Sequence, residues 1–281
     1  MLQTGCLYIV PTPIGNLSDI SARALEVLQQ VDLIAAEDTR HSSRLLGHYQ
    51  ISTRTISMHA HNEHQRTGLL IEKLKQGMAI ALISDAGTPL ISDPGYEFVN
   101  TCRAEGLNVI ALPGPCALTT ALSASGLPTD TFTFFGFLPV KQQAKTEQLL
   151  KAAQAGHTCV FYEAPRRITD TLKLCKEALP EHTHYVLAKE LSKTFETYVS
   201  GNIDTLLAYL SADPGHVKGE FVLMLHCKTL QAAGLPESAI SLLKDLLPLL
   251  PPKQASAAVA KHYAVNKKQL YELSLSLKTP E

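Results

Sequence analysis

Short apolar segments, each long enough for one strand, alternate with helix-length segments over the first 228 residues. In the N-terminal part these segments are apolar at nearly every position, as in 7–10 and 79–83. Strands buried on both faces have this composition, and they occur in parallel sheets that helices cover on both sides. The sequence therefore predicts an α/β fold, with a parallel sheet in an N-terminal domain over 1–125. The expected strands are 7–10, 32–36, 55–58, 79–83 and 109–112, and the expected helices are 22–28 (capped by Ser21), 42–48, 63–76 and 96–104.

The pattern changes near 125–128, where Ser, Gly and Pro interrupt the chain. Beyond this point, 131–137 alternates aromatic and polar residues, as a half-buried strand does. A second α/β domain with a mixed sheet is predicted over 126–228. Its expected strands are 131–137, 157–162, 185–191, 195–199 and 221–227, with helices at 143–154, 167–178 and 203–210. No strand signal follows, so two Pro-punctuated helical pieces predict a third, small helical unit over 229–281.

The composition limits the functional class. The chain has 25 Lys and Arg and 26 Asp and Glu, so its formal net charge is −1. This balance excludes a histone-like protein that binds polyanions over its whole surface. No apolar run reaches the roughly 18 residues of a membrane span, and the N-terminus lacks the pattern of a signal peptide. The six cysteines form no Cys-x-x-Cys pair, which favours a reducing, cytoplasmic location. Charged residues make up only 18%, which leaves room for a subunit interface.

Four loops rich in Pro, Gly and acidic residues follow predicted strands, at 10–16, 37–40, 84–89 and 113–117. Ligands of open α/β sheets bind outside the carboxyl ends of the strands, so these loops are expected to meet around a ligand. The alternative is that each loop is an ordinary turn.

The motifs for phosphate binding are absent from these loops. There is no Gly-x-Gly-x-x-Gly after the first strand and no Walker sequence. S-adenosylmethionine fits better, because carbonyl oxygens and carboxylates interact favourably with its sulfonium cation. Prolines have no backbone N–H, so loops rich in proline present mainly carbonyl oxygens to a ligand. This argument favours a ligand without phosphate, and S-adenosylmethionine is one such ligand.

Two long motifs, at 8–17 and 82–95, and a short one at 36–40 resemble the tetrapyrrole-methylase superfamily, and more narrowly its ribosomal RNA small-subunit methyltransferase I branch. Shorter matches extend the resemblance over about 6–228. The resemblance implies two α/β domains with S-adenosylmethionine in a cleft between them, usually in a homodimer. It also implies methylation of the ribose 2′-hydroxyl of a cytidine in small-subunit ribosomal RNA, either naked or in the assembled subunit. The shorter matches are 113–115, 161–165, 188–191 and 218–220.

Position by position, the resemblance implies nine cofactor contacts. This chain has Arg166-Arg167 where the family usually has His-Arg, so it lacks the family's imidazole at this point. We therefore assign both arginines to RNA contact and neither to catalysis. The cofactor contacts are Pro13, Ser84, Asp85, Ala86, Ile91, Cys116, Ala117, Tyr162 and Ala188.

The segment 40–66 is basic, with four Arg, five His and a single acid, so its formal charge is +3 in a chain of −1. Its histidines lack a zinc-ligand spacing, and no metal is expected. They are either ordinary surface side chains or part of an RNA-facing patch that includes Arg44. Our hypothesis is that Asp38 orients the site, Arg40 holds a phosphate and His59 accepts the hydroxyl proton.

The tail 252–271 is typical of a helix-turn-helix, with Ala258, Val265 and Leu270 as its apolar seam. Between 251 and 270 there are four Lys and no acid, so Lys267 and Lys268 are expected to contact RNA. The alternative is a packing appendage.

An RNA ribose 2′-O-methyltransferase is the leading interpretation. One alternative is a methylase of tetrapyrroles or of a modified amino acid on the same fold. The other is a ribosome-assembly factor without enzymatic activity.

Overall fold

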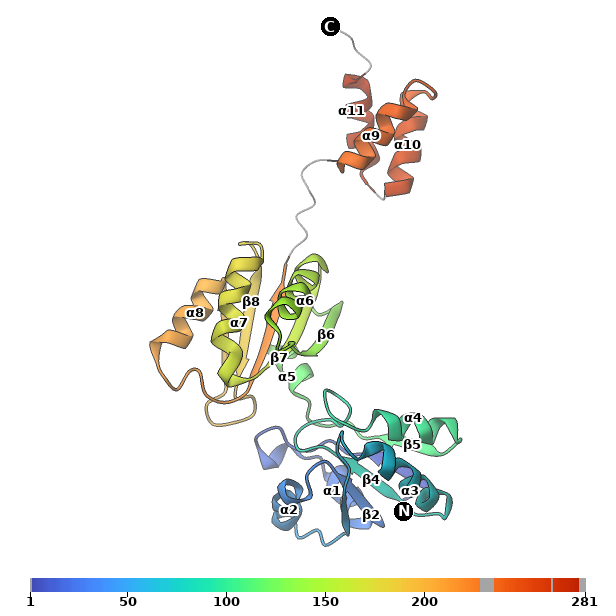
Figure 1. Cartoon of the computed structure of the whole chain (residues 1–281), viewed down its shortest axis with the longest axis vertical. Helices are drawn as coiled ribbons and strands as arrows, with labels where there is room; N and C mark the ends of the chain where they lie inside the picture. Colours follow the sequence, from blue (N-terminus) through green and yellow to red (C-terminus); the bar gives the residue numbers. More distant parts are fainter. Residues whose placement is uncertain (1, 228–234, 264, 278–281) are drawn as a thin grey trace. The chain divides into compact units, whose positions relative to one another are not determined.

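The computed structural model describes residues 2–227, 235–263 and 265–277, which form two units. The first unit is Met1–Lys228 and the second is Thr229–Glu281. The first unit contains two five-stranded sheets with their helices, and the described part of the second unit is helical (Figure 1). The predicted boundary between 228 and 229 lies outside the described residues.

The first sheet is parallel throughout, which confirms the prediction for the N-terminal part. Its order is β3-β2-β4-β1-β5. Strands β1, β2 and β4 are buried at every position, because helices cover both faces. The strands are β1 (Cys6–Ile9), β2 (Leu33–Ala36), β3 (Thr55–Ser57), β4 (Ile80–Ile83) and β5 (Asn108–Ala111).

Successive strand residues point to opposite faces, and each face has its own helices. Tyr8 packs in one cluster with Val27 of α1, whereas Leu7 packs in another with Leu70 of α3 and Phe98 of α4. Ser21 caps α1 as predicted, since its side chain accepts a hydrogen bond from the amide of Ala24. The elements are η1 (Leu17–Asp19), α1 (Ala22–Gln30), α2 (Thr39–His48), α3 (Glu63–Lys75) and α4 (Tyr96–Ala104).

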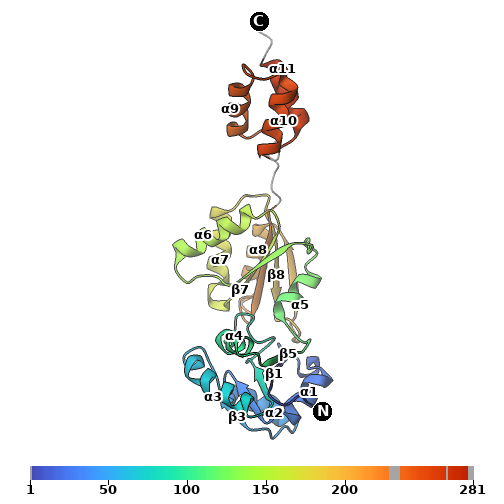
Figure 2. The same cartoon turned by 90° about the vertical axis from the view of Figure 1, so that its right-hand side faces the viewer.

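The second sheet is mixed, as predicted, in the order β6-β7-β10-β8-β9. Only β6 and β7 run parallel, and the other pairs are antiparallel. Three helices, α6, α7 and α8, pack against one face (Figure 2). The strands are β6 (Phe132–Phe137), β7 (Thr158–Glu163), β8 (His184–Lys189), β9 (Thr197–Gly201) and β10 (Phe221–His226); the helices are α6 (Gln142–Gln154), α7 (Pro165–Ala178) and α8 (Ile203–Ala212).

Helix α5 (Ala117–Ala124) was not expected from the sequence. It precedes the predicted domain boundary at 125, yet Leu118 and Ala121 pack against Val160 and Val222 of the second sheet. The helix is short and mostly apolar, and no charged face marks it in the sequence. The first unit thus has two halves, one around the parallel first sheet and one around the mixed second sheet, and α5 connects them. It covers the face of the second sheet opposite α6–α8.

The second unit contains three helices among its described residues, where two pieces were expected: α9 (Glu237–Leu246), α10 (Pro252–Tyr263) and α11 (Lys267–Ser276). Their core includes Leu243, Val259 and Leu270. The predicted seam was wrong at Ala258, which is exposed because α10 buries the face of Ala255 and Val259 instead. Among the described residues, no helix has the length and apolarity to cross a membrane.

Candidate active site

The four predicted loops meet at the carboxyl edge of the first sheet. Thr12 and Gly87 exchange two backbone hydrogen bonds of 2.9 Å each. The Thr88 hydroxyl donates to the carbonyl of Pro115 at 2.9 Å. A further bond of 3.2 Å runs from the Asp38 amide to Oδ1 of Asp85. The prediction that the loops converge is thus confirmed, and the hydrogen bonds tie each loop to another.

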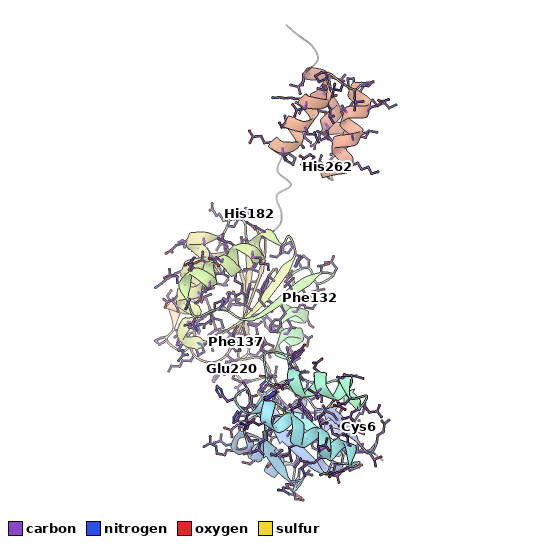
Figure 3. All side chains as sticks on the ribbon, turned by 45° about the vertical axis from the view of Figure 1, so that its right-hand side comes forward. Cys6, Phe132, Phe137, His182, Glu220 and His262 are labelled. Carbon is purple, nitrogen blue, oxygen red and sulfur yellow. The ribbon has the colours of Figure 1, made fainter. Side chains whose placement is uncertain are left out.

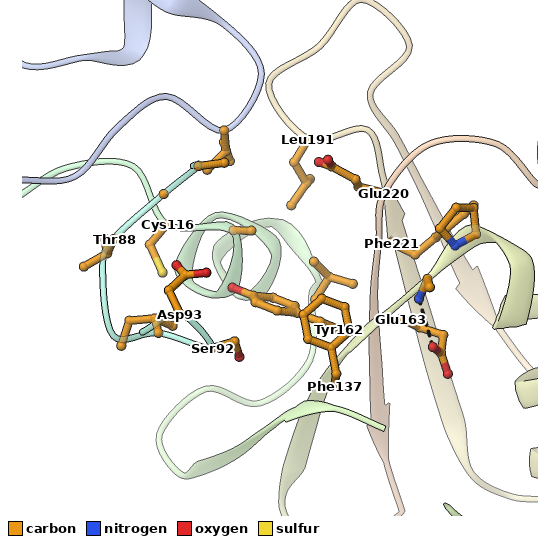
Figure 4. A pocket seen from close by; sticks show the side chains of 18 residues that line it. Thr88, Ser92, Asp93, Cys116, Phe137, Tyr162, Glu163, Leu191, Glu220 and Phe221 are labelled. Carbon is orange, nitrogen blue, oxygen red and sulfur yellow. Dashed lines mark hydrogen bonds between the residues drawn. The ribbon is translucent and has the colours of Figure 1, made fainter. Parts of the chain in front are cut away.

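A cavity of about 340 Å3 lies where these loops face the second sheet (Figure 4). Most of its lining is apolar, three lining residues are acids, and none is Lys, Arg or His. Phe137 and Glu220 lie at the end of the second half that faces the first (Figure 3). The lining residues are Ile14, Ala86, Gly87, Thr88, Ile91, Ser92, Asp93, Cys116, Ala117, Phe137, Tyr162, Glu163, Ala164, Pro165, Leu191, Glu220, Phe221 and Val222.

The loop after β4 has an unusual backbone where it lines the cavity. Leu90 and Ser92 have φ values of 73° and 72°, a left-handed conformation that costs free energy for residues other than glycine. Gly95 has a φ of 123°, and a Cβ there would lie 2.8 Å from Cδ2 of Leu82. The surroundings must hold this loop in place.

Glu63 holds the end of this loop. Its Oε1 accepts hydrogen bonds from the amides of Gly95, Glu97 and Phe98 at 3.1, 2.8 and 3.3 Å. These amides belong to the start of α4, where N–H groups have no partner inside the helix. The single acid of the basic segment 40–66 therefore has a structural function beside the cavity.

Asp93 lines the cavity, and its carboxylate lies near those of Glu37 and Asp85, two acids behind the lining. Burial, and then the neighbouring charges of Glu37 and Asp85, raise the pKa of Asp93 to about 6, while a hydrogen bond from Ser84 works in the other direction. The pKa of Glu37 is also raised, mainly by burial. The carboxyl ends of β2 and β4 thus hold a group of carboxylates, and no Lys, Arg or His of the described ranges forms an ion pair with Asp93.

Tyr162 forms the opposite wall. Its hydroxyl accepts a hydrogen bond of 3.0 Å from the amide of Leu118, which joins β7 to α5. The rings of Phe134 and Phe137 lie 4.9 and 5.5 Å from its ring, both edge-on. Burial raises the pKa of Tyr162 well above the usual value for tyrosine, so its hydroxyl stays protonated.

Glu163, next to Tyr162, is the centre of a buried ion network. Its side chain is 0% exposed, and its Oε1 lies 2.7 Å from Nε of Arg167. Oε2 accepts a hydrogen bond of 2.7 Å from Thr171 and lies 3.8 Å from Nζ of Lys145. The backbone amide of Ala164 donates to Oε1 at 2.8 Å. Every oxygen of this carboxylate is engaged, and the network fixes the turn after β7.

The rim of the cavity joins the two halves through Lys193. Its Nζ lies 2.8 Å from Oε1 of Glu190 and 3.1 Å from Oε2 of Glu220. A Cβ on Gly15 would lie 2.4 Å from Cγ of Lys193, so the first loop packs directly on this side chain. Ser192 also donates a hydrogen bond to the carboxylate of Asp19.

Five of the nine predicted cofactor contacts line the cavity: Ala86, Ile91, Cys116, Ala117 and Tyr162. The other four lie just behind it. Ser84 is buried, and its hydroxyl lies 3.4 Å from the carbonyl oxygens of both Ala86 and Gly87, within reach of donating to either. Asp85 binds the Asp38 amide, Ala188 is buried in the second sheet, and Pro13 precedes the lining residue Ile14.

None of the three predicted catalytic residues lines this cavity. Asp38 caps α2, since its Oδ1 accepts from the amides of Arg40 and His41 at 2.8 and 3.4 Å. These bonds and the Arg40 guanidinium lower the pKa of Asp38. The Arg40 side chain is 91% exposed. Nε2 of His59 lies 3.2 Å from Nδ2 of Asn62, and its Nδ1 is buried without a hydrogen-bond partner among the described residues.

Of the predicted RNA contacts, Arg167 is the one whose guanidinium is engaged by other groups of the protein. Besides its ion pair with Glu163, its guanidinium donates to the carbonyl of Leu138. Local sequence patterns do not indicate this engagement, because Leu138 lies in the loop after β6 and Glu163 lies at the end of β7. Arg44 and Arg166 are exposed, and Lys267 and Lys268 are exposed in the first turn of α11.

Sequence reasoning missed Asp93, Phe137 and Glu220 as lining residues. Asp93 stands inside a motif that the resemblance used, and the signal available was an acid in a loop dense in Pro and Gly. The other two come from the second half, and no local pattern indicates which side chains there face the loops. Among the described residues, no group of three His, Cys, Asp or Glu side chains is placed to hold a metal ion.

The family model described as Tetrapyrrole (Corrin/Porphyrin) Methylases matches residues 6–207, well over half of the chain. The chain belongs to this family. Within it, proteins named ribosomal RNA small subunit methyltransferase I are similar over nearly their whole length, which confirms the narrower resemblance. The one from Vibrio cholerae is 50% identical over 96% of this chain and 94% of its own. The one from Escherichia coli O157:H7 is 49% identical over 96% and 95%.

The family membership makes the chain a methyltransferase. A second family model, the RsmI C-terminal HTH domain, matches residues 233–278. Two solved structures share the fold at 18% identity: a Thermus thermophilus uroporphyrin-III-C-methyltransferase (TM-score 0.53, over 79% of this chain and 94% of that one) and a cobalt precorrin-4 methyltransferase (TM-score 0.55, over 78% and 94%). They confirm the predicted fold class.

Proposed function

We propose that the chain transfers a methyl group from S-adenosylmethionine to the ribose 2′-hydroxyl of a cytidine in small-subunit ribosomal RNA. The names of its relatives support the RNA substrate. The observation that carries the cofactor assignment is the cavity, which has acidic side chains and no cationic one. Such a site favours a sulfonium cation and disfavours a phosphate.

The residues of the cavity fit this cofactor. Apolar side chains such as Ile14, Ile91 and Leu191 provide contacts for an adenosyl group, and Asp93 and Glu220 provide negative charge. We assign Ala86, Cys116, Ala117 and Tyr162 to its binding as well. When bound, S-adenosylmethionine would supply an electrophilic methyl group. The chain contributes orientation, and its apolar lining excludes water from the reacting groups.

Exposed cations on both units support RNA as the partner. Arg44 and Arg166 in the first unit, and Lys267 and Lys268 in the second, would hold phosphates. Asn266 caps α11 and places the two lysines in its first turn, the position from which helix-turn-helix proteins contact nucleic acid. Arg167 is omitted from this assignment because Glu163 engages it.

We further propose a homodimer that works in the cytoplasm, where ribosomal subunits are available. Strand β6 is an edge strand, and apolar side chains on it and just beyond it are exposed, among them Phe132 and Val140, the latter at 82%. Exposed apolar groups beside a sheet edge favour association with a second chain.

The test of the proposed function is methyl incorporation. Purified protein, labelled S-adenosylmethionine and small ribosomal subunits from a strain that lacks this gene are combined, and the modified nucleotide is mapped. We expect one 2′-O-methylcytidine in the small-subunit RNA. Incorporation into a tetrapyrrole and not into RNA, or no binding of S-adenosylmethionine by calorimetry, would contradict the proposal.

Removal of residues 230–281 tests the role of the second unit. We expect weaker RNA binding with a flatter salt dependence, and unchanged cofactor binding, because the cavity lies wholly within 14–222. The double substitution Lys267→Ala, Lys268→Ala is the matched control that leaves the unit in place, and it should reproduce part of the loss. RNA affinity equal to that of the full chain in both variants would remove this role.

A further inference from the structure

Three acidic residues line the cavity, and the surroundings of their side chains differ. Glu163 is fully engaged by Arg167, Thr171, Lys145 and a backbone amide. Glu220 is paired with Lys193 and is 74% exposed. Asp93 makes no ion pair with any Lys, Arg or His in the part of the chain that the structure describes. Of these three acids, Asp93 is the half-buried one whose carboxylate has no cationic partner among the described residues.

The placement of Asp93 directs it toward the cavity. Its carboxylate points toward the Tyr162 hydroxyl, with the Cys116 thiol beside them (Figure 4). The preceding Ser92 has a φ of 72°, and the following Pro94 restricts the backbone further. Strained conformations of this kind persist where the surrounding structure holds them, and here Glu63 holds the end of the loop.

We propose that Asp93 is the catalytic base that accepts the proton of the RNA 2′-hydroxyl. This inference rests on the proposed function. It gives Asp93 the role of proton acceptor, for which the sequence alone suggested His59. A base must reach the reacting hydroxyl, and His59 lies outside the cavity lining while Asp93 is part of it.

The atoms and charges of the step balance without a further reactant. The hydroxyl proton moves to an Oδ of Asp93, and the O–H electron pair stays on the ribose oxygen and forms the new bond to the methyl carbon. The S–C bond breaks with its pair kept on sulfur, so the positive charge of the sulfonium and the negative charge of the carboxylate are both lost. The carboxylic acid then releases its proton to water.

The groups around the Asp93 carboxylate are suited to a base that takes up and releases a proton, because none of them is a cation that would hold it ionised in an ion pair. Glu37 at the end of β2 and Asp85 after β4 face Asp93 with like charge, and together with burial they raise its pKa to about 6. From the second half, the Tyr162 hydroxyl faces it and stays protonated, because burial raises the pKa of that phenol. Ser84 donates a hydrogen bond to the carboxylate. A base with a pKa near the working pH is both available and strong enough to accept a proton.

The experiment measures methylation of small ribosomal subunits by full-length Asp93→Asn, Asp93→Glu and wild-type protein between pH 5 and pH 9, with S-adenosylmethionine binding measured in parallel. The base must be ionised, so wild-type kcat/KM should fall as pH drops below about 6. We expect Asp93→Asn to lose about 10²–10⁴-fold in kcat and to lack this pH dependence, with cofactor affinity changed by less than about tenfold. Asp93→Glu should retain the pH dependence at a lower rate.

Glu220→Gln is the matched control, because it removes another negative charge from the same cavity. It should keep the decline below pH 6, and so should His59→Ala. The inference is overturned if Asp93→Asn keeps kcat within about threefold of wild type, or if it only weakens cofactor binding while kcat at saturation is unchanged. If the wild-type protein itself does not methylate the subunits, the proposed function fails first, and that result is distinct from either of these.

Discussion

The two halves of the first unit treat their buried carboxylates in opposite ways. At the edge of the parallel sheet, Glu37 and Asp93 are partly buried beside like charges, and the pKa of each is raised. In the mixed-sheet half, Glu163 is more deeply buried, yet Arg167 and Lys145 compensate it. The first arrangement lowers stability and provides reactive groups, whereas the second fixes a wall of the cavity. Under the proposed function, the loops of the first half carry the reacting carboxylate and the second half supports them.

Glu163→Gln is the substitution that should damage the second half most. It leaves Arg167 and Lys145 buried without their counter-charge, and we expect a loss of about 3–5 kcal/mol in the free energy of unfolding. Urea denaturation of the two variants measures it, with Asp204→Asn as the control, since that variant breaks the exposed pair with Lys176 and should cost at most about 0.5 kcal/mol. Equal, small losses would mean that burial does not distinguish the two ion pairs.

Asp93→Asn should have the opposite effect on stability. Because the pKa of Asp93 is raised from 3.8 to about 6, the ionised carboxylate disfavours the folded state at neutral pH. We expect the variant to be more stable by ~1 kcal/mol at pH 7.5, a value reduced for the part of the side chain that water still reaches. The gain should shrink as the pH falls from about 6 through 3.8, because below 3.8 the aspartate is protonated in both the folded and the unfolded state. A destabilised variant at pH 7.5 would show that Asp93 supports the fold.

Lys193→Ala tests the contact between the halves and should have the smallest effect. The side chain is 28% exposed and pairs with Glu190 and Glu220, so its loss should cost less than about 1 kcal/mol in stability. Cofactor affinity should fall by about threefold, because Leu191 and Glu220 on the cavity rim lose their support. Calorimetry measures this change, and a tenfold or larger loss would mean that the rim, and not the loops, dominates cofactor binding.

The sequence predicted the parallel sheet and the meeting of the four loops because both depend on local signals. Apolar strands such as 80–83 and the Pro- and Gly-rich segments after them are recognisable one at a time. Contacts between distant elements were not predictable in this way. The engagement of Arg167 depends on Glu163 and on Leu138, and no local pattern indicates that His59 stands outside the residues that line the cavity.

Helix α5 shows the same limit. Its mostly apolar sequence carries no periodic signal, and only its packing on Val160 and Val222 defines it. The side chains of Phe137 and Glu220 enter the cavity for the same reason, since the position of the second sheet relative to the loops decides which residues face them.

The most direct test of this account is the structure of the protein with S-adenosylhomocysteine bound, determined by crystallography. We predict that the adenosyl group occupies the cavity between the 86–93 loop, Cys116 and Tyr162, with the sulfur atom on the side of Asp93. Density for the ligand at any other place, or a complex in which the Asp93 carboxylate is turned away from the ligand, would contradict it.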